Sequence, residues 1–120
     1  MAKPSKQQEK ILAELKEDIL SQMISMGHWS EETLLPLWTI PLAVLRRNAT
    51  QRHGVTRFRR GASATELKTE DVETIDLHPQ LLNEFWNDYA RFVLYHEYLH
   101  ALGNRFHDAT FRQLESYWPF

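Results

Sequence analysis

One pentapeptide constrains the fold of this chain more than any other feature: it reads His96-Glu97-Tyr98-Leu99-His100. Two histidines four residues apart lie about one turn apart on the same face of a helix, so both imidazoles can bind one ion. Glu97 lies about 100° around the helix, at the flank of such an ion. Zinc hydrolases use this arrangement, with two nitrogen ligands and a carboxylate that accepts a proton from a zinc-bound water. We therefore predict a helix here with a metal site on one face.

A third ligand is predicted just beyond this helix. The chain contains no cysteine, so a transition metal has to be held by histidine and carboxylate side chains. A catalytic zinc has three protein ligands and one open position. Gly103 allows the chain to leave the helix in a left-handed turn, and His107 follows it. We predict His107 as the third ligand, with Asp108 and Glu115 as alternatives.

The same residues also have purely structural interpretations. His96 and His100 could be core histidines bound to backbone carbonyls, and His107 a cap or surface residue. Glu97 could be a surface carboxylate in an ion pair. Two imidazoles and a carboxylate in semi-apolar surroundings are costly without an ion. The metal interpretation is therefore preferred for the histidines, and the role of general base is preferred for Glu97.

Length and composition indicate one globular domain over residues 1–120. The chain is 42% hydrophobic and 25% charged, as in ordinary folded domains. The formal net charge of −2 gives no overall argument for a nucleic-acid partner. The N-terminus runs into charged residues rather than an apolar secretory segment. The longest mostly apolar stretch, Leu34–Leu45, is too short to span a membrane. We therefore expect a cytoplasmic protein.

The first helix is predicted over about residues 5–26. Ser5 and Gln8 have the spacing of a capping box, and apolar residues follow at helical intervals. Gly27 supplies the C-terminal stop. The apolar stripe could lie on a membrane surface, but packing on the core is the preferred interpretation.

The remaining elements before residue 79 are predicted to be two helices and a small sheet. Ser30 can cap a short helix, and a second helix is predicted from Pro41 to about residue 53, which completes an N-terminal helical part over residues 5–53. Three short strands then form an antiparallel sheet that needs a helix on one face. These strands are Val55–Arg59, Thr65–Lys68 and Glu73–Leu77.

The C-terminal region is predicted to contain a buried central helix and a short final helix. Pro79 opens the helical region, which ends at Gly103 and is interrupted near Asn83 or Asn87. Its apolar surface is too broad for an exposed helix, so we expect it to be buried. Asp108 can cap the last helix. The apolar residues of the central region are Leu81, Leu82, Phe85, Trp86, Tyr89, Phe92, Val93, Leu99 and Leu102.

Three stretches of the sequence resemble the SprT-like (Spartan-type) family of metalloproteases. The pentapeptide at residues 96–100 is followed by His107-Asp108-Ala109-Thr110-Phe111, similar to the further histidine and phenylalanine of that family. Residues 56–61 (TRFRRG) resemble its basic strand ending in glycine, and residues 75–82 (IDLHPQLL) its strand leading into P-x-L-L. The similarity covers about residues 55–118, without the C-terminal zinc ribbon of the family.

This resemblance implies a zincin-like minimal α+β domain that hydrolyses peptide bonds. It implies zinc bound by His96, His100 and His107, with Glu97 as the catalytic base. The implied substrates are proteins or peptides, and DNA-associated proteins, as in repair of DNA–protein crosslinks, are one class of them. Two other functions stay open: a metal-dependent nuclease that uses the same three histidines, and a non-catalytic, zinc-stabilised interaction module.

A run of arginines is the candidate surface for contact with DNA. Such a run can bind phosphates, which fits a protease that acts on nucleic-acid-bound proteins, or it can be a solvated face that balances local acids. The run consists of Arg46, Arg47, Arg52, Arg57, Arg59 and Arg60, together with His53.

Overall fold

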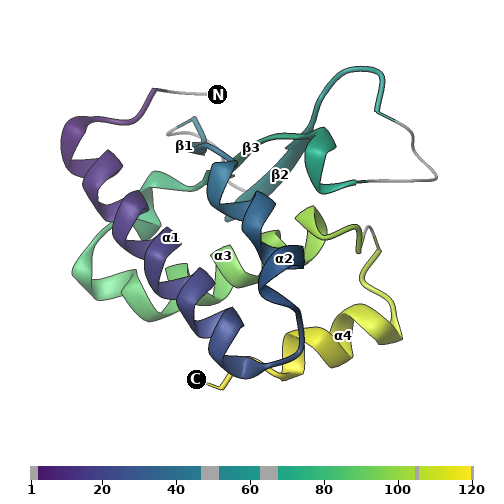
Figure 1. The fold of residues 1–120 in the computed structure, drawn as a ribbon. Helices are drawn as coiled ribbons and strands as arrows, with labels where there is room; N and C mark the ends of the chain where they lie inside the picture. Colours follow the sequence, from purple (N-terminus) through teal and green to yellow (C-terminus); the bar gives the residue numbers. More distant parts are fainter. Residues whose placement is uncertain (1–2, 47–51, 63–67, 105, 120) are drawn as a thin grey trace.

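Figure 1 shows a computed structural model of the chain, which describes residues 3–46, 52–62, 68–104 and 106–119. The described residues form an α+β fold, as predicted, in which four α-helices accompany a three-stranded sheet. None of these helices is long and apolar enough to cross a membrane. The helices are α1 (Lys6–Met26), α2 (Glu31–Leu34), α3 (Asn87–Ala101) and α4 (Ala109–Ser116), and the strands are β1 (Leu42–Val44), β2 (Gly54–Phe58) and β3 (Val72–Leu77).

Helix α1 has the predicted ends and the predicted buried face. Ser5 Oγ accepts the backbone N–H of Gln8, and Gln8 Oε1 accepts the backbone N–H of Ser5, which completes the capping box. Gly27 ends the helix with φ of 77°, a left-handed conformation that glycine adopts without strain. The buried side chains form one stripe on the core: Leu12, Leu15, Ile19, Leu20 and Met23.

The predicted helix from Pro41 to residue 53 is wrong over its described part. Leu42–Val44 form strand β1, and Ala43 and Val44 are both buried. The strand pairs in parallel with Ile75–Leu77 of β3. Backbone pairing to a strand far along the chain outweighs the helix start that the proline indicated locally. Residues 47–51 lie outside the described part.

The sheet is mixed rather than purely antiparallel, because β1 takes the place of one predicted strand. Its order is β1-β3-β2, with β2 antiparallel to β3 and β1 parallel to it. Strands β2 and β3 match the predicted Val55–Arg59 and Glu73–Leu77. The third predicted strand, Thr65–Lys68, falls mostly outside the described residues, and Lys68 itself precedes a 3₁₀ turn, Thr69–Asp71.

The central helical region is interrupted near Asn83 and Asn87, as predicted. Two 3₁₀ turns, Pro79–Leu81 and Glu84–Trp86, precede α3. Asn83 Oδ1 accepts the N–H of Trp86 at 3.1 Å, so this side chain caps the second turn. Helix α3 then begins at Asn87 and continues through the HEYLH pentapeptide.

The predicted burial of this region is correct for Leu81, Leu82 and the later turns of α3, but wrong for the aromatic residues between them. Phe85, Trp86 and Tyr89 are 89%, 38% and 39% exposed. Phe85 and Trp86 belong to the Glu84–Trp86 turn and Tyr89 to the first turn of α3, and their rings face outward. Farther along α3, Leu94, Tyr95, Tyr98 and Leu99 are fully buried.

The core lies where α1, α3 and the sheet meet. Helix α3 packs against α1, β2 and β3, while α1 also contacts β1 (Figure 1). Helix α4 packs on α3, and the Tyr95 and Trp118 rings stack there with centroids 4.9 Å apart. Helix α3 therefore lies between the edge strand β2 and helix α4, which carry further residues of the site.

Candidate metal centre

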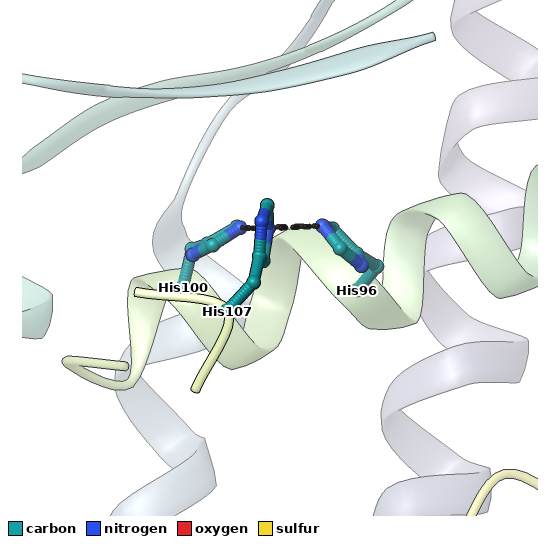
Figure 2. A group of neighbouring side chains, drawn as sticks. All are labelled: His96, His100 and His107. Carbon is teal, nitrogen blue, oxygen red and sulfur yellow. Dashed lines mark hydrogen bonds between the residues drawn. The ribbon is translucent and has the colours of Figure 1, made fainter. Parts of the chain in front are cut away.

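Three histidine side chains converge on one point at the C-terminal end of α3. His96 and His100 come from α3, and His107 comes from the loop before α4 (Figure 2). Their Nε2 atoms form a nearly equilateral triangle, with separations of 3.2 Å (96–100), 3.0 Å (100–107) and 3.1 Å (96–107). Such a group can hold a metal ion.

The hydrogen bonds on the far side of two rings decide where their protons lie. Nδ1 of His100 is 2.7 Å from the carbonyl oxygen of Asn104, which only accepts, so Nδ1 is the donor. Nδ1 of His96 donates in the same way to Oε2 of Glu115 at 2.5 Å. In the neutral rings both Nε2 atoms then carry bare lone pairs directed at the same point. This arrangement is repulsive without a cation and stable with one.

The spacing of the three nitrogens fits a first-row transition metal. Bonds of 2.0–2.1 Å to a tetrahedral zinc place neighbouring ligand nitrogens about 3.3 Å apart, close to the 3.0–3.2 Å observed. Three protein ligands leave one coordination position for a water or substrate. Imidazole nitrogens also bind copper, iron and nickel, so the donor set indicates a transition metal without selecting one.

The local structure of the chain positions each histidine. Gly103, with φ of 103°, turns the chain out of α3, and its N–H bonds to the carbonyl of His100. Asp108 caps α4 by accepting the N–H of Phe111 at 2.9 Å, so this alternative ligand serves as a helix cap instead. The buried Phe111 ring lies 4.7–4.9 Å from all three imidazole centroids. It forms the apolar floor of the site.

Burial favours the neutral form of the His100 ring. It lowers the pKa of His100, and the neighbouring His96 and His107 lower it further, while the bond to Asn104 acts in the opposite direction. A pKa below the ordinary value of a histidine leaves the ring neutral at pH 7. Metal binding needs the neutral ring, so no proton has to be displaced.

Glu97 is buried beside the histidines and is fixed by the edge strand β2. Glu97 is 5% exposed. Thr56 Oγ1 lies 2.8 Å from Oε1 of Glu97 and 3.0 Å from the backbone carbonyl oxygen of Glu97. Both are acceptors, so the Thr56 hydroxyl is the donor. Burial raises the pKa of the Glu97 carboxyl, and the hydrogen bond from Thr56 partly opposes this. A raised pKa makes the carboxylate a better proton acceptor near neutral pH.

Gly54 explains how β2 approaches Glu97 so closely. A Cβ atom at this position would lie 2.9 Å from Cγ1 of Val93, 3.0 Å from Cγ of Glu97 and 3.1 Å from its Oε2. The first contact is closer than real Cβ atoms tolerate, so any larger residue would push strand and helix apart. This role of Gly54 depends on packing between distant segments, and no local sequence pattern predicts it.

A cleft of about 630 Å³ opens in front of the three histidines. One wall is β2, which is an end strand of the sheet in the described part of the chain, and the other is α3. His53 and Tyr89 stand at its border, with His53 Nδ1 2.7 Å from the Tyr89 hydroxyl. The three histidines and Glu97 are therefore reached from this cleft.

The arginine run is partly used within the fold. Arg57 forms an ion pair with the fully buried Asp76, with 2.6 Å between Nε and Oδ2. Arg59 pairs with Asp71 at 2.7 Å. Arg52 lines the cleft, and position 47 lies outside the described residues. The two pairs match the interpretation that the run balances local acids.

The structure brings together the four residues that the sequence predicted for the site, and it adds three. His96, His100, His107 and Glu97 all line the cleft, and Glu115, an alternative ligand, contacts His96 through the ring nitrogen that faces away from the triangle. Thr56, Gly54 and Phe111 received no site role from local patterns. Local patterns could not find them, because their contacts join segments far apart in the sequence. Thr56 and Phe111 were included only in the motifs of the family resemblance.

Comparisons with known proteins leave the family of this chain open. A scan against protein-family models found no match, and searches of the curated proteins and of the solved structures found no significant similarity.

Proposed function

We propose that the protein is a zinc-dependent metallopeptidase with a zincin-like, SprT-like fold. In this proposal His96, His100 and His107 hold zinc, and Glu97 is the general base. One observation carries the proposal: a buried carboxylate lies in the same cleft as a three-histidine site, fixed by a hydrogen bond to an edge strand. A purely structural zinc site has four protein ligands and no need of an adjacent base.

The residues of the chain divide the reaction between them. Zinc bound here would polarise the substrate carbonyl and acidify a coordinated water. Thr56 occupies Oε1 of Glu97, which leaves Oε2 to take the proton of the attacking water and pass it to the departing amine. Glu115 and Asn104 keep the protons of His96 and His100 on Nδ1, away from the metal.

The position of β2 supports a peptide as the substrate. An extended peptide can add to the outer edge of a terminal strand through backbone hydrogen bonds, in a way largely independent of its side chains. Strand β2 lines the cleft and carries Thr56, so a peptide on this edge would pass the histidines. The nuclease alternative has less support, since Arg57 and Arg59 are engaged by Asp76 and Asp71.

The test is metal analysis and proteolysis with the wild type and Glu97→Gln. We expect both proteins to bind one zinc and only the wild type to cleave casein, a natively unfolded protein. Glu73→Gln, on the exposed side of β3, is the matched control and should cleave as the wild type does.

Other results of these assays would contradict the peptidase proposal. Equal cleavage by wild type and Glu97→Gln would remove Glu97 as the base. Cleavage of an oligonucleotide instead of casein would favour the nuclease, and zinc binding without either activity would favour an interaction module. The same digestion with and without DNA tests the proposed contact with DNA-associated substrates. Absence of zinc from both proteins would refute the site itself.

A further inference from the structure

Three aromatic side chains are exposed side by side at the start of α3. Phe85 is 89% exposed, Trp86 38% and Tyr89 39%. The Phe85 and Trp86 ring centroids lie 5.8 Å apart, and those of Trp86 and Tyr89 6.4 Å apart, both edge to face. Exposed large apolar residues are ordinary when isolated, but a contiguous group marks a surface that binds something. We call these three residues the aromatic row.

The aromatic row continues into the cleft of the proposed active site. Tyr89 lines the cleft, and its ring contacts His53, another lining residue, with centroids 5.3 Å apart. Phe92 and Val93 follow on the same helix and also line the cleft. A chain bound at the histidines would therefore meet the aromatic row as it leaves the cleft past Tyr89.

Hydrogen bonds fix the turn that carries Phe85 and Trp86 and the hydroxyl of Tyr89. Asn83 caps the turn that carries Phe85 and Trp86, and the hydroxyl of Tyr89 is hydrogen-bonded to His53 at 2.7 Å. Aromatic side chains have few rotatable bonds, so little conformational entropy is lost when they are covered. These properties are typical of residues that contribute most to binding at interfaces.

Charges beside the row favour a polypeptide over a nucleic acid. Glu84 precedes Phe85 and Asp88 precedes Tyr89, and both acidic residues are exposed. Their carboxylates would repel the phosphates of a strand whose bases stacked on these rings. An extended polypeptide with apolar side chains meets no such repulsion.

We propose that the aromatic row is a docking surface for the apolar side chains of an extended polypeptide whose backbone lies in the cleft. This inference rests on the proposed function and gives it a substrate class: unfolded chains with aromatic or large aliphatic residues to one side of the cleaved bond. A folded protein would bury those side chains and would be a poor substrate.

Two peptides that differ only in the docking residues test this proposal. One carries phenylalanines on one side of a central cleavable segment, and the other has serine at those positions. We expect the wild type and Glu97→Gln to bind the phenylalanine peptide about 10-fold more tightly than the serine peptide, as measured by fluorescence anisotropy. Phe85→Ala and Trp86→Ala should lose most of this preference. Leu35→Ala removes an equally apolar residue, 65% exposed and not among the described residues of the cleft, and should keep it.

The outcomes separate docking from catalysis. Equal binding of both peptides by the wild type, or an unchanged preference in both row variants, would overturn the docking surface. It would also be overturned if the row variants lost affinity for single-stranded DNA and kept their peptide preference. If no protein cleaves either peptide but the preference depends on the row, the docking surface stands and the peptidase proposal fails. Phe85→Ala is informative even if Trp86→Ala folds poorly, since Phe85 is almost fully exposed.

Discussion

The hydrogen bond between Glu115 and His96 allows a quantitative test of the metal centre. Glu115→Ala leaves Nδ1 of His96 without its carboxylate, and Glu115→Gln keeps an acceptor but removes the charge. A hydrogen bond to a charged group contributes about 1.5–3 kcal/mol. The lower end applies here because the two side chains are 24% and 29% exposed. Glu115→Ala should therefore weaken zinc binding by about 10–30-fold, within the range known for such outer-sphere partners.

The assay is a competition between the protein and a chromophoric zinc chelator at neutral pH. Glu115→Gln should lie between the wild type and Glu115→Ala, about 4-fold weaker than the wild type, because a neutral hydrogen bond is about half as strong as a charged one. The zinc-induced rise in Tm should shrink in the same order. Glu73→Ala, an exposed glutamate outside the described cleft, should bind zinc as the wild type does.

Three results would contradict this reasoning. Wild-type affinity in Glu115→Ala would show that the carboxylate does not orient His96 toward the metal. A loss far beyond 100-fold, comparable with that of His107→Ala, would show that Glu115 is itself a ligand, as the sequence alone allowed. Equal losses in Glu115→Gln and Glu115→Ala would assign the effect to charge rather than to ring orientation.

Three further predictions follow from individual hydrogen bonds. Thr56→Val should reduce peptide cleavage about 10-fold with zinc affinity unchanged, since Glu97 loses a hydrogen-bond donor. Thr56→Ser keeps the hydroxyl and should cleave as the wild type does. Equal cleavage rates in the wild type and both variants would contradict the role of the hydroxyl. Tyr98→Phe should leave the free energy of unfolding in urea unchanged or raise it by about 1 kcal/mol, because the buried Tyr98 hydroxyl has no hydrogen-bond partner among the described residues. Tyr95→Phe should lower the free energy of unfolding, because the Tyr95 hydroxyl donates to the backbone carbonyl of Leu114. Burial lowers the pKa of Lys16, so the unfolded chain holds this proton at pH values where the folded chain has released it. The contribution of Lys16 to stability therefore rises with pH up to about 10.4. In denaturant titrations Lys16→Met should lose this contribution, and a pH dependence identical to that of the wild type would argue against it.

Local rules predicted the parts of the site that lie close together in the sequence. The helical repeat places His96 and His100 on one face whatever the rest of the chain does. Gly103 and Asp108 act within a few residues of themselves, as a left-handed turn and as a helix cap. The capping box of α1 is equally local. These features were predictable because their geometry is set by backbone conformation over a single turn.

Contacts between distant segments decided the rest. Pro41 indicated a helix, but parallel pairing with β3 makes the following residues a strand. The apolar pattern predicted burial of the aromatic row, because periodicity gives the spacing of side chains and not what covers them. The HEYLH pentapeptide alone predicted two metal ligands and a base. Only the packing of β2 and α4 against α3 decided that Thr56 orients Glu97 and that Glu115 orients His96, since these hydrogen bonds exist only once segments 41 and 19 residues apart have folded together.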